Sequence, residues 1–281
     1  MRKLYIDIGG THLRSQITEG STTLEASRSS RETGLLGYID ETVQRYPDIG
    51  FIGIAYAGQV HGGRILSAPN IDVDEPRLRE VVRTRYGIAL EIDNDLNCAV
   101  MAEARHYGAT SVAALYVGTG LGAAVIDGGR LVRGGRNLAF EIGHIPYRDA
   151  PFACGCGRSN CVELYASGSG MAKWLRHCGD EAAPQLRGLR ASPEAEKRQI
   201  AEGFDAALLH AAGTLVTLAN PELLVLGGGI VGENPELVAW LEAALKRAAL
   251  NTALEGLRIE ASTLKNAPIE GAKLLEERYY G

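Results

Sequence analysis

Short apolar runs that end at glycine alternate with longer amphipathic stretches along this 281-residue chain. The short runs predict buried strands, because glycine marks the tight turns at strand ends. In the longer stretches, apolar residues three or four positions apart predict helices. The strands are predicted at Leu4–Ile8, Phe51–Ala55, Ala114–Val117 and Leu223–Leu226, and the helices at Asn97–Tyr107, Ile200–Leu218 and Leu237–Leu250. Strands that alternate with helices indicate an α/β fold.

The same order of features occurs twice. Near the start, an apolar strand leads into Gly9-Gly10-Thr11 and then a second strand at Arg14–Thr18. Later, an apolar strand leads into Gly118-Thr119-Gly120 and then a second strand at Ala123–Ile126. Repeated hairpins of this kind indicate two related α/β lobes facing one another. A cleft between two lobes is a favoured place for a ligand.

Composition indicates a folded protein, since 46% apolar and 22% charged residues can build a sizeable core. The net charge is −5 and no segment gathers Lys and Arg into a dense block, which argues against a nucleic-acid partner. Asp7 interrupts the first apolar stretch, so no signal peptide is predicted, and no apolar run reaches a membrane-spanning length. We therefore expect a soluble, cytoplasmic protein with no membrane partner.

The two glycine–threonine turns are candidates for phosphate binding. Glycine lets backbone N–H groups approach a phosphate closely, and its tolerance of positive φ lets consecutive N–H groups point to one side. Thr11 and Thr119 each add a hydroxyl donor. Asp7, on the strand before the first turn, is placed to hold Mg²⁺ directly or through water. Either turn alone also fits an ordinary hairpin, whereas two of matching layout favour phosphate sites.

A third glycine cluster, Gly227-Gly228-Gly229, follows a predicted strand and precedes a predicted helix. It lacks the spacing and the downstream acid of the dinucleotide-binding fingerprint. The cluster fits an ordinary strand-to-helix turn, or else a flat backbone platform against which an adenosine lies.

The segment Glu91–Asn97 gathers acidic and amide side chains just before a predicted helix. Such residues commonly cap a helix N-terminus. A carboxylate in this position beside a cleft can also accept the proton of an attacking hydroxyl, as phosphoryl transfer requires. Asp95 is the candidate base, and Asn94 is the candidate to hydrogen-bond a neighbouring sugar hydroxyl. Helix capping is the alternative interpretation.

Three of the five cysteines, Cys154, Cys156 and Cys161, lie within eight residues, and His144 precedes the first by ten positions. An odd number of cysteines without a secretion signal is a poor disulfide framework. One imidazole and three thiolates make a closed tetrahedral set suited to structural Zn²⁺. The alternative is three unrelated thiols and a surface histidine, although crowded reactive thiols are a liability without a metal.

Two glutamates flank these candidate ligands. Glu141 precedes His144 by three positions, and Glu163 follows Cys161 by two. The segment from His144 to Cys161, called the metal loop below, would hold both carboxylates near one spot. There they can accept charge-assisted hydrogen bonds from a polyol. Taken singly, each is more often a solvated surface acid.

The motifs resemble, in their order and spacing, the ROK family, named after repressors, open reading frames and kinases. The resemblance covers nearly the whole chain. Its markers here are Asp7–Thr11, Asn94-Asp95, Gly118–Gly122, Glu141–His144, Cys154–Gly157, Cys161–Glu163 and Asn220–Glu222 running into the third glycine cluster.

This resemblance implies an actin-like, hexokinase-type (ribonuclease H-like) two-lobed fold with the active site in an interlobe cleft. The lobes would comprise residues 1–112 and 113–269, with a C-terminal helix at 270–281 packing back on the first lobe. The implied reaction is phosphorylation of a hexose at the expense of ATP and Mg²⁺, and the implied assembly is a homodimer.

Residue by residue, the resemblance implies that Asp95 is the catalytic base. The implied sugar contacts are Asn70, Asn94, Glu141, His144 and Glu163. The implied zinc ligands are His144, Cys154, Cys156 and Cys161. The implied nucleotide and phosphate positions are Asp7, Gly9, Gly10, Thr11, Gly118, Thr119, Gly120, Gly227, Gly228 and Gly229.

The sequence departs from the family pattern at several positions. Ala57 stands where proline is common, Phe140 stands where glycine usually precedes the first sugar-binding glutamate, and Asn160 replaces a glycine. The segment Ile71–Asp74 replaces an aromatic stretch. None of these changes removes a proposed catalytic or metal residue, but Phe140 and the altered segment put the identity of the sugar in question.

Three functions are compatible with the resemblance. Glucose is the default acceptor, and an N-acetylhexosamine, mannose or fructose kinase keeps the chemistry while changing the sugar. A sugar-responsive transcriptional regulator would need a helix-turn-helix segment before the first strand, which begins at Leu4. We therefore expect an enzyme.

Overall fold

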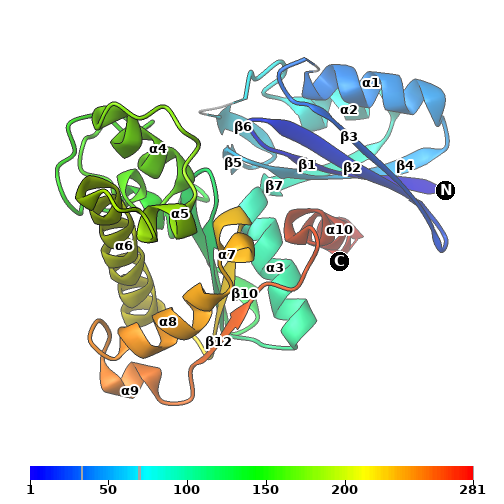
Figure 1. Ribbon diagram of the computed structural model, residues 1–281. Helices are drawn as coiled ribbons and strands as arrows, with labels where there is room; N and C mark the ends of the chain where they lie inside the picture. Colours follow the sequence, from blue (N-terminus) through cyan, green and yellow to red (C-terminus); the bar gives the residue numbers. More distant parts are fainter. Residues whose placement is uncertain (33, 69–70, 281) are drawn as a thin grey trace. The chain divides into compact units, whose positions relative to one another are not determined.

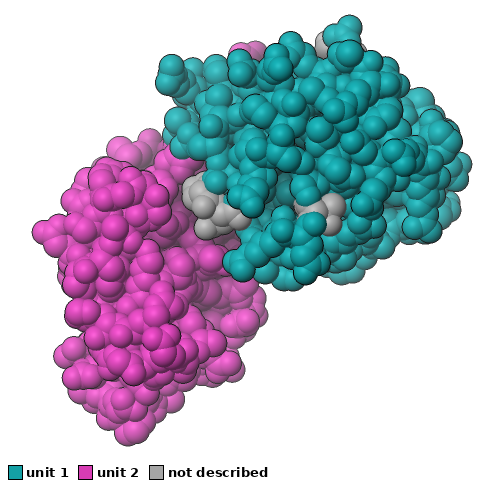
Figure 2. Space-filling view, turned by 90° about the horizontal axis from the view of Figure 1, so that it is seen from above, with its two compact units in different colours: residues 1–106, 133–139, 264–281 teal, residues 107–132, 140–263 magenta. Residues whose placement is uncertain are grey.

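Two five-stranded sheets organise the chain, one in each of two compact units (Figures 1 and 2). The computed structural model describes residues 1–32, 34–68 and 71–280. Unit 1 comprises residues 1–106, 133–139 and 264–281, and unit 2 comprises residues 107–132 and 140–263. The short segment 133–139 therefore belongs to a different unit from the residues on both sides of it.

Unit 1 contains one mixed sheet, a small two-stranded ribbon and helices on the sheet. Its strands are β1 (Arg2–Ile8), β2 (His12–Glu19), β3 (Thr22–Ser29), β4 (Ile49–Tyr56), β5 (Gln59–His61), β6 (Arg64–Ser67) and β7 (Ala89–Asn94). Its helices are α1 (Leu35–Arg45), α2 (Leu78–Tyr86), α3 (Asp95–Tyr107) and α10 (Ala267–Tyr280).

Unit 2 contains the second mixed sheet, its covering helices and two short 3₁₀ turns. Its strands are β8 (Val112–Val117), β9 (Leu121–Asp127), β10 (Arg130–Leu131), β11 (Leu223–Gly227) and β12 (Arg258–Ala261). Its helices are α4 (Gly168–His177), α5 (Leu186–Arg190), α6 (Ala195–Ala219), α7 (Gly229–Glu233), α8 (Glu236–Leu245) and α9 (Asn251–Leu254), and its 3₁₀ turns are η1 (Ile142–His144) and η2 (Val162–Leu164).

Both sheets follow the same plan. In unit 1 the order is β3-β2-β1-β4-β7, with β1, β2 and β3 antiparallel and β1, β4 and β7 parallel. In unit 2 the order is β10-β9-β8-β11-β12, again with three antiparallel strands and then three parallel strands. The strands β1 and β8 occupy the same place, and each ends at a glycine–threonine turn. The repeat predicted from the sequence is confirmed by this shared topology.

The sheet of unit 1 is covered on both faces, which explains its continuous apolar runs. Leu4, Ile6 and Ile8 of β1 are fully buried in one cluster together with residues of α1 and α2. Tyr5 faces the other way and packs with residues of α10. Successive side chains of a strand point to opposite faces, so both sets must be apolar.

Helix α10 completes the second face of unit 1. Ile269 and Leu275 of this helix pack with Tyr5, Phe51 and Cys98 in one buried cluster. Glycines at two positions let the backbone of α10 approach the backbones of β4 and α3 closely. A Cβ on Gly53 of β4 would meet the carbonyl oxygen of Ala272, and a Cβ on Gly271 would meet the backbone of Cys98 in α3.

The core of unit 2 is built around α6. Phe204, Leu208 and Leu215 of this helix are fully buried and pack in one cluster with Leu115 of β8 and Leu241 of α8. The apolar positions follow the three- and four-residue spacing of a helix with one buried face. This core supports β8 and β11, whose ends carry the two glycine clusters of unit 2.

Most of the predicted elements are present with slightly different ends. The predicted helix Ile200–Leu218 lies inside the longer α6, whereas the predicted helix Leu237–Leu250 ends at Leu245. The sequence pattern did not predict β3, because both faces of this edge strand are exposed and carry no alternation. Within the described ranges, no helix combines the length and apolar character needed to cross a membrane.

Replacing Gly271 with Ala should destabilise unit 1 by about 1–3 kcal/mol, because the added methyl group forces two helices apart. Gly37 is the matched control: it also lies in a helix, but a Cβ there meets nothing within 4 Å. Gly37→Ala should leave stability unchanged or raise it by up to about 1 kcal/mol. Urea unfolding of both variants tests this contrast, and equal midpoints would contradict the close approach.

Candidate functional site

Four side chains of unit 2 converge on one point. The ligand atoms of His144, Cys154, Cys156 and Cys161 all lie within 4.8 Å of one another. His144 Nδ1 is 3.6 Å from Cys154 Sγ, and Cys156 Sγ is 3.3 Å from Cys161 Sγ. A tetrahedron with Zn–N and Zn–S bonds of about 2.0–2.3 Å requires ligands at this kind of spacing. The four predicted ligands are brought together, and their chemistry and spacing fit one Zn²⁺ ion.

A short antiparallel closure holds the two ends of this metal loop together. Pro146 and Cys161 form an isolated β-bridge. The N–H of Val162 donates to the carbonyl oxygen of Ile145 at 3.1 Å. The closure therefore brings η1, which begins directly after Glu141, next to η2, which contains the second glutamate.

The three thiols of the loop differ in their readiness to ionise. Burial opposes ionisation of Cys156, but hydrogen bonds from the backbone and side chain of Arg158 lower its pKa to about 6. Burial raises the pKa of Cys154, and burial together with a hydrogen bond to Cys156 raises the pKa of Cys161 to about 12. Metal binding at the last two must displace protons, so affinity should fall as the pH falls.

The two glutamates flanking the metal loop lie close enough to interact. Desolvation raises the pKa of Glu141 although its side chain reaches solvent, and the charge of Glu163 raises it further against the opposing effect of His144. Glu163 Oε2 accepts the backbone N–H of Leu121 at 3.1 Å, and Glu163 Oε1 is 3.5 Å from Cys154 Sγ. Glu163 thus links the metal cluster to the turn before β9.

That turn, Gly118–Gly120, is fixed from two sides. The N–H groups of Gly168 and Ser169, at the start of α4, donate to the carbonyl oxygens of Gly118 and Thr119 at 2.8 and 3.0 Å. A Cβ on Gly120 would lie 2.7 Å from Glu163 Oε2. A larger residue at position 120 would therefore displace the glutamate.

The glycines of the two glycine–threonine turns differ from expectation in their backbone conformation. Gly9, Gly10, Gly118 and Gly120 do not have the positive φ that was expected of them. Gly120 is required because no room exists for a Cβ. Of the glycines predicted to handle phosphate or nucleotide, Gly228 has the left-handed backbone, with φ of 92°.

The third glycine cluster forms the strand-to-helix turn between β11 and α7. A Cβ on Gly227 would lie 2.5 Å from the ring of Tyr116, and a Cβ on Gly228 would meet the backbone of Val117. Both contacts are with β8, the neighbouring strand. Packing against β8 therefore explains these two glycines, whereas Gly229 has open space on its Cβ side.

In unit 1, Asp7 lies buried at the end of β1, directly before the first glycine–threonine turn. Asn266 Nδ2 donates to Asp7 Oδ2 at 3.2 Å, and Arg14 Nη1 is 3.6 Å from the same oxygen. Burial raises the pKa of Asp7 against the opposing effects of Asn266 and Arg14. Carboxylate oxygens are ligands that Mg²⁺ accepts, so the chemistry of this residue is compatible with the predicted Mg²⁺ role.

Asp95 is the first residue of α3, and Asn94 is the last residue of β7. Asn94 Oδ1 accepts the N–H groups of Leu96 and Asn97 at 2.9 and 3.1 Å, so the helix-capping interpretation is confirmed for this residue. Its amide nitrogen donates to the carbonyl oxygen of Gly58 at 3.1 Å. Asp95 is only partly buried.

One cluster next to these residues was not anticipated. Asp93 is buried, with only 2% of its side chain exposed, and Arg133 Nη2 donates to its Oδ2 at 2.6 Å. Asn97 and Asn137 donate to the other carboxylate oxygen, each at 3.0 Å. The segment before α3 gave a signal through its density of acids and amides, but nothing in the sequence links it to Arg133, 40 residues away.

Two positions noted in the sequence have particular outcomes. Asn70, predicted to contact the sugar, lies outside the described residues. Phe140 has φ of 63°, in the left-handed region that favours glycine. The backbone thus keeps the conformation expected of glycine, while the side chain packs against the core of unit 2.

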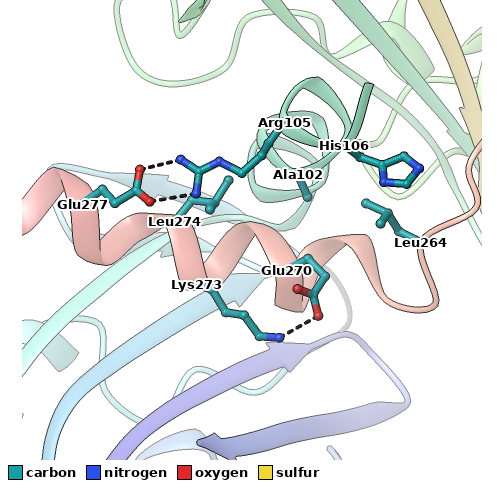
Figure 3. A pocket seen from close by; sticks show the side chains of 8 residues that line it. All are labelled: Ala102, Arg105, His106, Leu264, Glu270, Lys273, Leu274 and Glu277. Atoms are coloured by element: carbon teal, nitrogen blue, oxygen red, sulfur yellow. Dashed lines mark hydrogen bonds and ion pairs between the residues drawn. The ribbon is translucent and has the colours of Figure 1, made fainter. Parts of the chain in front are cut away.

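Figure 3 shows a pocket of unit 1 that none of the site residues described above lines. It runs between the C-terminal part of α3 and α10. Figure 3 shows Arg105 paired with Glu277 through two hydrogen bonds of 2.6 and 2.7 Å. The residues that line it are Ala102, Arg105, His106, Leu264, Glu270, Lys273, Leu274 and Glu277, none of which was predicted to bind a ligand.

The sequence pattern shared by the ROK family matches residues 4–278. The chain belongs to the ROK family. The resemblance predicted from the motifs is therefore confirmed over nearly the whole sequence.

The chain is similar to several known proteins of this family. It is 28% identical to a glucokinase from Streptomyces coelicolor over 277 residues, with 86% of each chain covered. It is 27% identical to an N-acetyl-D-glucosamine kinase from Salmonella newport over 250 residues, covering 80% of this chain and 82% of the relative.

A solved structure extends this similarity to the fold. The crystal structure of a ROK family glucokinase from Streptomyces griseus in complex with glucose and AMPPNP is 25% identical, has a TM-score of 0.77 and covers 98% of this chain and 99% of that chain. Together with the two mixed sheets, this match confirms the predicted fold class of two α/β lobes of the actin-like, hexokinase type.

The purified protein should carry about one zinc ion per chain, and Cys156→Ser should lose it, because three ligands hold Zn²⁺ far more weakly than four. The melting temperature should fall by several degrees, since the metal loop loses its closure. Cys178→Ser, which removes an exposed cysteine outside the cluster, is the control. Metal analysis that finds no zinc in the unsubstituted protein would contradict the assignment.

Proposed function

We propose that this protein is an ATP-dependent sugar kinase that transfers the γ-phosphoryl group of ATP to a hydroxyl of a hexose, with glucose as the first candidate. The observation that carries the proposal is the position of Glu163. Its carboxylate lies beside the Cys/His cluster, accepts a backbone N–H from the end of the Gly118–Gly120 turn and interacts with Glu141. The two glutamates proposed to bind a polyol and a candidate phosphate turn are thus linked within one unit.

In the proposed site, Glu141, His144 and Glu163 accept or donate hydrogen bonds to the sugar hydroxyls. Charge-assisted hydrogen bonds of this kind are short and directional, so they fix the orientation of the sugar ring. The metal loop has four protein ligands and therefore supplies shape rather than an open coordination position. Bound Zn²⁺ would hold η1 and η2 in register, and with them both carboxylates.

Asp95 is the proposed general base. Phosphoryl transfer needs a carboxylate that orients the attacking hydroxyl and takes its proton. Asp95 begins α3, and Asn94 fixes the helix start by capping it, so the carboxylate stands on a rigid element. The second amide hydrogen of Asn94 could donate to a neighbouring sugar hydroxyl.

The nucleotide is proposed to bind through the glycine–threonine turns. The N–H groups of Gly9 and Gly118 close their own turns, on His12 and Gly120. The backbone N–H groups that follow them in Gly9–Thr11 and Gly118–Gly120 would contact phosphate oxygens, with Gly227–Gly229 on the adenosine side. Asp7 would hold Mg²⁺ directly or through water, and Mg²⁺ would neutralise charge on the transferring phosphoryl group. Asn70 is also proposed as a sugar contact, from the family resemblance alone.

An N-acetylhexosamine is the second candidate acceptor. The chain is about as similar to the N-acetyl-D-glucosamine kinase as to the glucokinase. Phe140, directly before Glu141, is a bulky residue where the family usually has glycine, so the acceptor pocket of this chain can differ from both relatives.

A panel of sugars at fixed ATP and Mg²⁺, with ADP release coupled to a spectroscopic signal, tests the proposal. Glucose, mannose, fructose, N-acetylglucosamine and N-acetylmannosamine should be compared by kcat/KM, and the product of the best acceptor identified by mass. ADP release that no sugar stimulates would overturn the proposed function.

Asp95→Asn should lower kcat by about 10²–10⁴-fold, because an amide cannot take the proton of the attacking hydroxyl. Sugar affinity, measured by calorimetry, should be retained. Asp127→Asn is the matched control, since Asp127 is an exposed aspartate at the end of β9. An Asp95→Asn variant with unchanged kcat would exclude this residue as the base.

A further inference from the structure

The carboxylate of Asp93 is the centre of a buried polar network in unit 1. Its Oδ2 accepts from Arg133 Nη2 at 2.6 Å, and its Oδ1 accepts from the side chains of Asn97 and Asn137 at 3.0 Å each. The backbone N–H of Asn94 also donates to Oδ1, at 2.9 Å. Burial opposes ionisation, yet these partners, chiefly Arg133, lower the pKa of Asp93. The residue is therefore a fully paired anion.

Two of the partners of Asp93, Arg133 and Asn137, come from a closed loop, residues 133–139. The N–H of Ala139 donates to the carbonyl oxygen of Arg133 at 3.2 Å and closes the loop. Inside it, Arg133 Nη1 donates to Asn137 Oδ1 at 2.7 Å, and Asn137 Nδ2 donates to the carbonyl oxygen of Val60 at 2.8 Å. Asn137 has φ of 61°, a conformation that asparagine tolerates better than most residues. The loop is thus held in one shape against β5 and β7.

A buried ion pair is weak evidence for a role in stability, because apolar residues of similar volume often stabilise a fold as well. What the pair does supply is geometry. The guanidinium group is planar and bonds Asp93 and Asn137 with two of its nitrogens, which fixes the loop in both distance and angle. The network is therefore better suited to positioning than to folding.

The positions connected by the network are the ones that the proposed reaction uses. Asp93 is two residues before Asp95 at the junction of β7 and α3. The loop 133–139 belongs to unit 1, and the chain leaves it directly into Phe140 and Glu141 of unit 2. One carboxylate thus anchors both the strand end that carries the proposed base and the segment that leads to a proposed sugar ligand.

We propose that Asp93, Arg133 and Asn137 are positioning residues for phosphoryl transfer, which fix the start of α3 that carries Asp95 and the point at which the chain leaves unit 1 for Glu141. This proposal rests on the proposed function. The loop is bonded to Asp93 and Asn97, on either side of the proposed base, and its outgoing end is the residue from which the chain enters unit 2. Misplacement of a bound substrate by about 1 Å can reduce a rate by about 10²-fold. Loss of the bonds of Arg133 should therefore be measurable as a lower kcat/KM.

The test is steady-state kinetics of Arg133→Ala and Arg133→Lys with the best acceptor of the sugar panel. In Arg133→Ala, kcat/KM for the sugar should fall by about 100-fold, while KM for ATP should change by less than about twofold. Guanidinium ion added at millimolar concentration should restore part of the activity, because it refills the vacated site. Arg133→Lys keeps the positive charge but loses the planar arrangement of guanidinium N–H donors. Its KM for the sugar should rise, while its free energy of unfolding should stay close to that of the unsubstituted protein.

Arg105→Ala is the matched control, because it removes a bidentate arginine–carboxylate pair from the other end of α3 (Figure 3). Its sugar kinetics should equal those of the unsubstituted protein. Urea unfolding of each variant separates lost structure from lost positioning.

The effects of Asp93→Asn and Arg133→Ala on kcat/KM should be strongly non-additive, since both break the same network. Normal sugar kinetics in Arg133→Lys, or a loss in Arg133→Ala that matches its unfolded fraction and that guanidinium does not relieve, would overturn the positioning role alone. Absence of sugar phosphorylation by the unsubstituted protein would overturn the proposed function and this proposal with it.

Discussion

Closure of the metal loop is the constraint on which the candidate site of unit 2 depends. The loop has only a small buried cluster of its own, around Cys154, Cys161 and Leu164. Its shape is set by a β-bridge at Pro146 and Cys161 and by four ligand atoms within 4.8 Å of one another. Because the two glutamates lie at the two ends of the loop, the same closure determines their separation. Glu163 in turn fixes the Gly118–Gly120 turn, because its carboxylate accepts the N–H of Leu121, the residue after the turn. Each part of the site is thus positioned by a contact with the preceding one.

The shared plan of the two sheets gives each unit a turn at the same topological place. In both, the strand between the antiparallel and parallel halves of the sheet is buried and ends at glycine and threonine. The units differ in the segment after their antiparallel strands. In unit 1, β3 is separated from α1 by only a few residues, whereas in unit 2 a long insertion lies between β10 and α6. This insertion carries the metal loop, while the sheet of unit 2 keeps the same strand order as that of unit 1.

The sequence predicted the buried elements and the metal ligands well, because both depend on short-range spacing. Continuous apolar runs, helical periodicity and the grouping of three cysteines with a histidine can all be recognised within a few residues. The features that it missed depend on contacts across the chain. The strand β3 has no buried face, the pair of Asp93 with Arg133 joins positions far apart in sequence, and Gly120 is required by a side chain from another segment. Phe140 adopts the left-handed backbone conformation that favours glycine, which its side chain alone does not predict.

The place of α10 in unit 1 has a consequence for the order of events during biosynthesis. The strands β1 and β4 leave the ribosome first, but Tyr5 and Phe51 are buried by Ile269 and Leu275, which are translated near the end of the chain. Until then, one face of the first sheet stays exposed to water and to other nascent chains. Unit 2, whose residues 107–132 and 140–263 are complete earlier, can therefore finish folding before unit 1. A truncation that removes α10 would expose the apolar residues of this sheet face, among them Tyr5 and Phe51.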